Sequence, residues 1–158
     1  MFTPDETDLK ILTELQKNGR IKLNELADAV GLSVPSTTDR IHKLESNGII
    51  ESYHTKLNHK LLGKDITAFI FVTSDSSANY PDFVKHALST PEILECHSIT
   101  GDGSHILKIR TENTSSLEKL LSQIQKWKGV RATRTSIVLS THKESFEIKL
   151  KNNLKEKN

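Results

Sequence analysis

The chain has 158 residues, enough for one medium domain or two small ones. It is 35% hydrophobic and 27% charged, a composition typical of folded globular proteins and not of disordered ones. No apolar run approaches the ~20 residues of a membrane span, no signal segment follows Met1, and the single cysteine, Cys96, excludes an internal disulfide. We therefore expect a cytoplasmic protein.

The net charge of +2 does not indicate a nucleic-acid partner. Residues 1–58 contain 7 Lys/Arg against 9 Asp/Glu, a balance of −2, whereas residues 59–158 contain 15 against 11, a balance of +4. Any argument for DNA binding must therefore rest on where individual charges lie.

The first helix is expected to begin at the sequence Thr3-Pro4-Asp5-Glu6. Thr3 is the expected N-cap, Pro4 takes the first helical position, and Glu6 completes a capping box. Asn18-Gly19 ends the helix. Its apolar stripe consists of Leu9, Ile11, Leu12 and Leu15.

A second short helix stops at Gly31, and a tight turn leads into a third. The second helix has Lys22 at its N-cap position, where the side chain cannot accept a backbone hydrogen bond. Gly31 takes the left-handed conformation, and Ser33 caps the third helix through the amide of Ser36. Three short helices with this turn indicate a helix-turn-helix.

The third helix has a buried stripe of Thr37, Ile41 and Leu44 and ends near residues 47–48. Its other face resembles a recognition helix, with small residues near base edges and cations near phosphates. The residues that we expect at DNA are Ser33, Pro35, Ser36, Thr38, Asp39, Arg40, His42 and Lys43. Within this set Arg40 and Lys43 are expected to contact phosphates, and Ser36 and His42 to contact bases.

Two alternatives apply to this helix. Asp39 either accepts a hydrogen bond from a cytosine amino group or pairs with Lys43 one turn further on. The whole helix is alternatively an ordinary capped surface helix, because three-helix units also occur in interaction modules.

Residues 49–57 are β-prone and predict a strand that leads into a linker, with the boundary at residues 62–65. The domain assignment is a helix-turn-helix domain over 1–50, a strand and linker over 51–65, a dimerisation and effector domain over 66–145, and a C-terminal tail over 146–158. The last eight residues of that tail are polar and are expected to fray.

Beyond the linker the sequence predicts an α+β domain of ferredoxin-like order βαββαβ. Its expected elements are a strand at 66–73, a helix at 81–89, strands at 93–100 and 105–111, a helix opened by Ser115 and Glu118 and ended by Gly129, and a strand at 130–140. Right-handed crossovers would place both helices on one sheet face. Because the first strand is largely apolar on both faces, a second subunit is expected to cover the other face.

The set of residues that follows resembles the Lrp/AsnC (feast/famine) family of bacterial and archaeal regulators. It consists of Asp5, Asp8, Ile11, Leu12, Leu15, Gln16, Asn18-Gly19-Arg20, Glu25-Leu26-Ala27, Gly31-Leu32-Ser33, Arg40, Leu44-Glu45, Gly48-Ile49-Ile50, Leu62-Gly63, Thr100-Gly101 and residues 135–139. The resemblance covers roughly residues 4 to 145. It implies a winged helix-turn-helix joined to a βαββαβ effector module, double-stranded DNA as partner, dimers that associate into tetramers or octamers, and an amino acid as effector.

The resemblance places the effector site at a turn between two strands of the second domain. The expected effector residues are Thr100, Gly101, Asp102, Gly103 and Ser104. Its glycines can expose backbone N–H groups to a ligand carboxylate, and the hydroxyls of Thr100 and Ser104 could add donors. The family has an aromatic-Asp-aromatic sequence where Gly103, Ser104 and His105 stand here, so Asp102 is the one nearby carboxylate for a ligand ammonium group.

Two rival functions remain open at this point. Sirohaem decarboxylases resemble this family, and Cys96-His97 and His105 could meet on adjacent strands. The sequence nevertheless has no metal-ligand spacing and no phosphate loop, so we expect no catalytic, metal or cofactor site. The other rival, an interaction protein without a DNA role, has only the acidic N-terminal balance in its favour.

Overall fold

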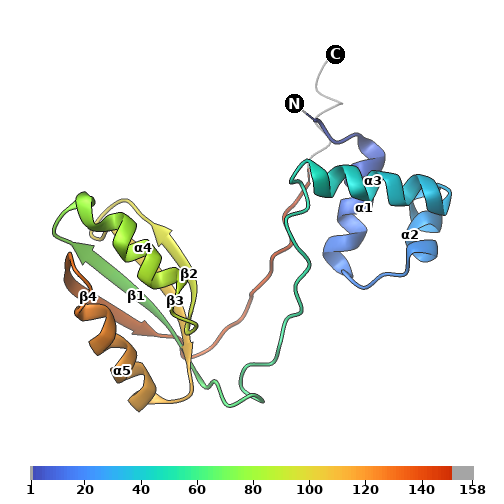
Figure 1. Cartoon of the computed structure of the whole chain (residues 1–158). Coiled ribbons are helices and arrows are strands. Elements are labelled where there is room, and N and C mark those ends of the chain that lie inside the picture. Colours follow the sequence, from blue (N-terminus) through green and yellow to red (C-terminus); the bar gives the residue numbers. More distant parts are fainter. Residues whose placement is uncertain (1, 151–158) are drawn as a thin grey trace. The chain divides into compact units, whose positions relative to one another are not determined.

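The computed structural model describes residues 2–150 and has α+β architecture (Figure 1). The chain forms two compact units, of which the first comprises the chain up to Lys56 together with the segment from Lys143, and the second comprises Leu57–His142. Within the described range, no helix is long and apolar enough to cross a membrane.

The first unit contains three helices, α1 (Glu6–Lys17), α2 (Leu23–Val30) and α3 (Val34–Ser46). Their shared core consists of Ile11, Leu12, Leu26 and Leu44. Gly31 ends α2 with a φ of 72°, and the Ser33 hydroxyl accepts a hydrogen bond from the Ser36 amide at 3.3 Å. The predicted helix-turn-helix is therefore confirmed, down to the cap of its third helix.

The predicted N-cap of the first helix is wrong. Asp5, and not Thr3, caps α1 by accepting from the Asp8 amide at 2.8 Å, and Asp8 accepts from the Asp5 amide at 2.9 Å. An acidic pair at the two capping positions also interacts favourably with the positive end of the helix dipole, an advantage that a threonine hydroxyl lacks. Lys22 makes no side-chain cap bond at the start of α2, as expected.

The strand predicted at residues 49–57 is also wrong, because no strand lies between α3 and the first strand of the second unit. A strand exists only with a partner, and no backbone–backbone ladder engages residues 51–58 within the described chain. This segment is held by side chains instead, since the Lys56 ammonium group donates to the Glu144 carbonyl at 3.1 Å.

The segment from Lys143 to Leu150 packs with the first unit, although the sequence assigned residues up to 145 to the second domain and the rest to a tail. The Gln16 side chain on α1 donates to the Ile148 carbonyl at 3.2 Å and accepts from the Ile148 amide at 2.7 Å. Leu150 packs against the helical core. The expected fraying of residues 151–158 lies outside the described residues.

The second unit has the predicted βαββαβ order, in a four-stranded antiparallel sheet of order β2-β3-β1-β4. Its elements are β1 (Ile66–Ser74), the 3-10 turn η1 (Ser77–Asn79), α4 (Tyr80–Leu88), β2 (Ile93–Ser98), β3 (His105–Thr111), α5 (Thr114–Gln125) and β4 (Val130–Ile137).

Several boundaries differ from the predicted ones. Asn113 and Ser116 form the capping box of α5 in place of Ser115 and Glu118, and the helix ends four residues before Gly129. The second and fourth strands end at Ser98 and Ile137, two and three residues before the predicted ends.

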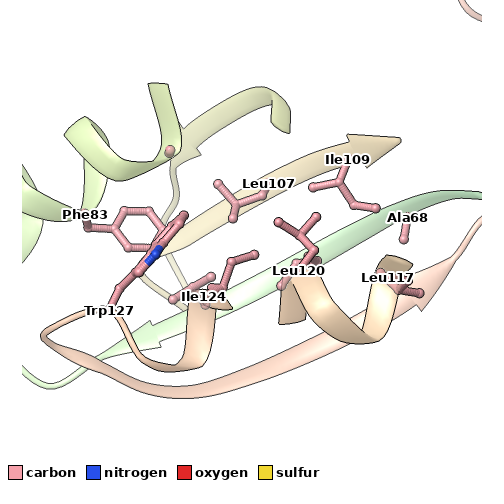
Figure 2. Packing of buried hydrophobic residues seen from close by; sticks show 11 residues of the cluster. Ala68, Phe83, Leu107, Ile109, Leu117, Leu120, Ile124 and Trp127 are labelled. Atoms are coloured by element: carbon pink, nitrogen blue, oxygen red, sulfur yellow. The ribbon is translucent and has the colours of Figure 1, made fainter. Parts of the chain in front are cut away.

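Both helices cover the same face of the sheet. The buried β1 residues Ala68, Ile70 and Val72, which share one face, belong to one core cluster with side chains of both α4 and α5. Figure 2 shows Leu117, Leu120 and Ile124 of α5 directed at the sheet, and Trp127, 8% exposed, closing the cluster near Phe83. The opposite face of β1, with Phe69 and Phe71, stays half-buried in the single chain.

Candidate nucleic-acid interface and effector turn

The candidate DNA-contacting residues lie at the start and along one face of α3. Six of them have exposed side chains: Ser33, Pro35, Ser36, Asp39, His42 and Lys43. The side chain of Thr38 is half-buried, and its hydroxyl donates to the Val34 carbonyl at 2.9 Å. The Ser33 and Ser36 hydroxyls lie 2.8 Å apart. Small polar groups thus surround the exposed N-terminus of α3, and Lys43 lies two turns further along.

Arg40 makes a contact that the sequence did not predict. Its guanidinium Nη1 lies 2.7 Å from Asp5 Oδ2 and 2.7 Å from Asp8 Oδ1. The Asp8 carboxylate is buried, and the Arg40 side chain is only 31% exposed. We call this contact the Arg40 bridge. It joins α3 to the capping box of α1, so Arg40 helps to hold α3 in position.

The charges of the Arg40 bridge stabilise one another. The backbone N–H of Asp8 and the Arg40 guanidinium together hold the pKa of Asp5 below its ordinary value, against the opposing effect of burial. The hydrogen bonds that Arg40 donates to Asp5 and Asp8 raise the pKa of Arg40. The Asp5 carboxylate is therefore ionised at neutral pH. Helix periodicity could not have revealed either carboxylate, because both lie more than 30 residues from Arg40 in the sequence.

A second contact at α3 involves the linker. The Tyr53 hydroxyl donates to Glu45 Oε1 at 3.0 Å, and His42 Nδ1 lies 3.4 Å from the other oxygen of Glu45. Partial burial and the Glu45 carboxylate raise the pKa of Tyr53 to about 12. Glu45 therefore orients His42, one of the predicted base-contacting residues. Within residues 2–150 no ion pair engages Asp39 or Lys43, so the predicted Asp39–Lys43 pair does not form.

The five predicted effector residues form one turn between β2 and β3. Two backbone bonds hold it, from the Ile99 amide to the Ser104 carbonyl at 3.0 Å and from the Ser104 amide to the Val72 carbonyl at 2.8 Å. Gly101 has a φ of 102°, which favours glycine. A Cβ on Gly103 would lie 3.2 Å from the Val72 carbonyl oxygen, so the turn lies close against β1.

The exposed part of the turn consists of Thr100, Gly101 and Asp102. Ser104 is half-buried, and its hydroxyl donates to the Val72 carbonyl at 3.0 Å. The donor role predicted for Ser104 therefore does not fit, because its single proton is already engaged. The groups that remain open to a ligand are the Thr100 hydroxyl, the Asp102 carboxylate and the backbone at Gly101.

The residues of the rival haem-related function do not form one site. His97 pairs with Ile106 and Cys96 with Leu107 in the β2–β3 ladder, so their side chains point to opposite faces of the sheet. His105 faces the helix-covered side. Within the described chain, no three His, Cys, Asp or Glu side chains are grouped so that they could hold a metal ion.

The fold and the two sites define a class of protein, a transcription regulator with a helix-turn-helix module and a separate ligand-binding module. Comparisons agree with this assignment. The sequence profile described as Lrp/AsnC ligand binding domain matches residues 67–148, and the one described as winged helix-turn-helix DNA-binding matches residues 4–51.

Similar proteins cover almost the whole chain. The HTH-type transcriptional regulator FL11 of Pyrococcus furiosus is 35% identical over 93% of this chain and 97% of its own. The leucine-responsive regulatory protein of Escherichia coli is 35% identical over 93% and 92%. The crystal structure of a Neisseria meningitidis transcriptional regulator in complex with L-Met is 30% identical, covers 93% and 97%, and superposes with a TM-score of 0.88. The chain belongs to the Lrp/AsnC family and is a DNA-binding transcription regulator.

Replacement of Arg40 tests the Arg40 bridge. We expect Arg40→Ala to lower the stability of the first unit by about 1.5–3 kcal/mol, because it leaves the buried Asp8 carboxylate without its charged partner. The loss should appear in the helical far-UV signal during denaturant unfolding, whereas Trp127, the single tryptophan and in the second unit, should report an unchanged transition.

The control for this prediction is Lys43→Ala, an exposed cation on the same helix, which should change stability by less than about 0.5 kcal/mol. Because the folded-state pKa of Asp5 is lowered, the Asp5 carboxylate stabilises the folded first unit above pH 3.8, its ordinary pKa. That stabilisation is lost as the pH falls through the folded-state pKa. Equal stability of Arg40→Ala and Lys43→Ala at neutral pH would contradict the bridge.

Proposed function

We propose that this regulator binds specific DNA sequences through the exposed face of α3, as an oligomer whose binding responds to an amino acid or related small molecule at the effector turn. The observation that carries the proposal is the exposed, capped N-terminus of α3, held against α1 by the Arg40 bridge. A rigid helix with small polar groups at its start suits close approach to base edges in the major groove.

Within this surface we assign two kinds of contact. Lys43 provides a flexible cation for a DNA phosphate. Ser33, with Pro35 and Thr38 nearby, brings the start of α3 against the DNA backbone. Ser36, Asp39 and His42 are exposed on successive turns and are the candidates for base contacts. Arg40 acts through the position of the helix and makes no contact with phosphate.

The experiment compares variants in binding to the promoter region of the protein's own gene over a range of salt concentrations. We expect Lys43→Ala to lower affinity for all sequences and to reduce the slope of log K against log salt by about 0.9, one phosphate contact. Arg40→Ala should lower affinity with an unchanged slope. Ser36→Ala or His42→Ala should change sequence preference by about 1–3 kcal/mol. If Lys43→Ala changes neither affinity nor slope near 0.1 M salt, the proposed surface is wrong.

For the effector, the open groups of the turn suit a zwitterion. The backbone near Gly101 and the Thr100 hydroxyl provide donors for a carboxylate, and Asp102 provides the acceptor for an ammonium group. The complex of the similar Neisseria meningitidis regulator with L-Met supports an amino acid as the class of ligand.

A thermal-shift screen of the common amino acids tests this site. A ligand present at about 100 times its Kd should stabilise the protein by about 2.7 kcal/mol. Asp102→Ala should abolish the shift, and Asp65→Ala, which removes an exposed carboxylate elsewhere in the second unit, should preserve it. Substitution of Gly101 is unsuitable here because its positive φ would strain the turn itself. If no amino acid at millimolar concentration shifts the melting temperature, the proposed amino-acid binding at the effector turn is wrong.

We further propose that a second copy of the chain covers the sheet face that the helices leave open. This face carries Phe69, Phe71 and Ile106, all half-buried, and the Arg134 guanidinium lies 4.5 Å from the centre of the Phe71 ring. Packing this apolar strip against the same strip of a second chain would remove both from water. Higher assembly into tetramers or octamers remains the expectation from the family.

Light scattering at micromolar concentration tests the dimer. The molar mass of the wild-type protein should be twice 17.8 kDa or a multiple of that value. Phe71→Glu should dissociate into single chains, because the substitution would bury a carboxylate in the interface. Leu88→Glu, at an equally apolar but 81% exposed position on α4, should leave the assembly unchanged. A wild-type protein that remains at 17.8 kDa would contradict the dimer.

A further inference from the structure

A histidine is buried directly behind the effector turn. His105 begins β3, follows Ser104 in the sequence, and is 1% exposed. Its ring centroid lies 4.6 Å from that of Tyr80 in an edge arrangement and 4.4 Å from that of Phe83, so it packs beneath α4. The role of this histidine is not explained by the proposed contacts with DNA or effector.

The hydrogen bonds around Ser104 determine which nitrogen of His105 carries the proton. The Ser104 hydroxyl has one hydrogen, which it donates to the Val72 carbonyl at 3.0 Å. His105 Nδ1 lies 3.1 Å from the same oxygen and must therefore be the donor in that contact. Nε2 is left with a lone pair, and it is the one buried side-chain nitrogen or oxygen within residues 2–150 that has no partner.

No carboxylate of the described chain is paired with His105. The titratable neighbours are Tyr80 on α4, Cys96 on β2, which packs against the same core, and His86, whose ring stacks on Trp127 at 5.3 Å. The charged α4 residues Asp82 and Lys85 are exposed, and no ion pair of the described chain includes His105. Burial lowers the pKa of His105 and raises that of the Cys96 thiol, so both groups are neutral near pH 7.

We propose that His105 is a proton switch beneath the effector turn: a proton from solvent taken up at Nε2 expels the ring from the core and opens the turn at residues 100–104. A charged imidazolium cannot remain between Phe83 and the apolar side chains of the sheet without a partner. When the ring leaves, its bond to the Ser104 hydroxyl is lost, and the turn loses its side-chain contact with the core beneath α4. The consequence for effector binding rests on the proposed function of the turn, whereas the switch itself does not.

The direction of the pH effect follows from the lowered pKa. Above the ordinary value of 6.5, folded and unfolded chains both carry a neutral His105, and stability does not depend on it. Below 6.5 the unfolded chain binds a proton that the folded core excludes, so unfolding becomes more favourable as the pH falls. The contribution of this one group to the unfolding equilibrium constant is at most tenfold per pH unit until the folded-state pKa is reached.

NMR of the full-length wild-type protein without ligand tests the switch first. At neutral pH the nitrogen shifts of His105 should identify Nδ1 as protonated and Nε2 as unprotonated. Between about pH 7.5 and pH 5.5, the amide protection factors of Ile99 and Ser104 should fall together, while that of Leu107 in the middle of β3 is retained. A proton on Nε2 at neutral pH, titration of His105 near 6.5 in the folded protein, or constant protection of the turn would overturn the proposal.

A variant pair gives the second test. His105→Phe keeps an aromatic ring beside Tyr80 and Phe83 but cannot take up a proton, and His142→Phe makes the same change at an exposed position of the same unit. From pH 6.5 to pH 5.5 the unfolding equilibrium constant of wild type and of His142→Phe should rise by up to about fivefold relative to that of His105→Phe. Equal pH dependence of all three proteins would overturn the switch. If His105→Phe fails to fold, the NMR experiment on the wild-type protein tests the switch by itself. If the thermal screen finds no amino acid that binds, the effector proposal fails, but neither test of the switch is affected.

Discussion

The guanidinium of Arg40 on α3 lies 2.7 Å from each of two carboxylates that cap the start of α1, and this contact holds in place the helix that we propose binds DNA. The hydrophobic core of the first unit is small, with a cluster of four buried apolar side chains at its centre. One cation that bonds to both Asp5 and Asp8 fixes the orientation of α3 and also supports the helix cap. It removes Arg40 from the exposed face, which is left with Lys43 as its cation and with small polar groups that allow a close approach to DNA.

The sequence predicted those features that depend on local pattern. The turn at residues 31–33, its Ser33 cap and the βαββαβ order follow from turn residues and from helix and strand periodicity, and all are present in the structure. The strand predicted at 49–57 was wrong because strand propensity describes one segment, whereas a strand requires a partner that the described residues do not supply. The ion pair of Arg40 could not be predicted for a related reason, since a helical wheel gives the direction of a side chain but not a carboxylate 35 residues away.

The second unit combines an exposed turn with a buried support. The sequence identified the five residues of the turn, and glycine was required at two of them for different reasons, a positive φ at Gly101 and the approach of Val72 at Gly103. The sequence could not show that the Ser104 hydroxyl makes two hydrogen bonds, one to the Val72 carbonyl and one with His105. The turn is therefore anchored from within the core, and the groups that face solvent belong to its other end. This arrangement connects the proposed effector contacts on one side with core packing beneath α4 on the other.

The central claim is that the N-terminal part of α3 enters the DNA groove, and the single cysteine of the chain makes a direct measurement possible. A DNA-cleaving reagent tethered to Ser36→Cys in a Cys96→Ala background reports which bases lie beside that residue in the complex. We expect cleavage at a few adjacent positions within the binding site of the promoter fragment, and none when the same reagent is tethered at Ser145→Cys on the C-terminal segment. Cleavage from Ser145→Cys without cleavage from Ser36→Cys would contradict the account.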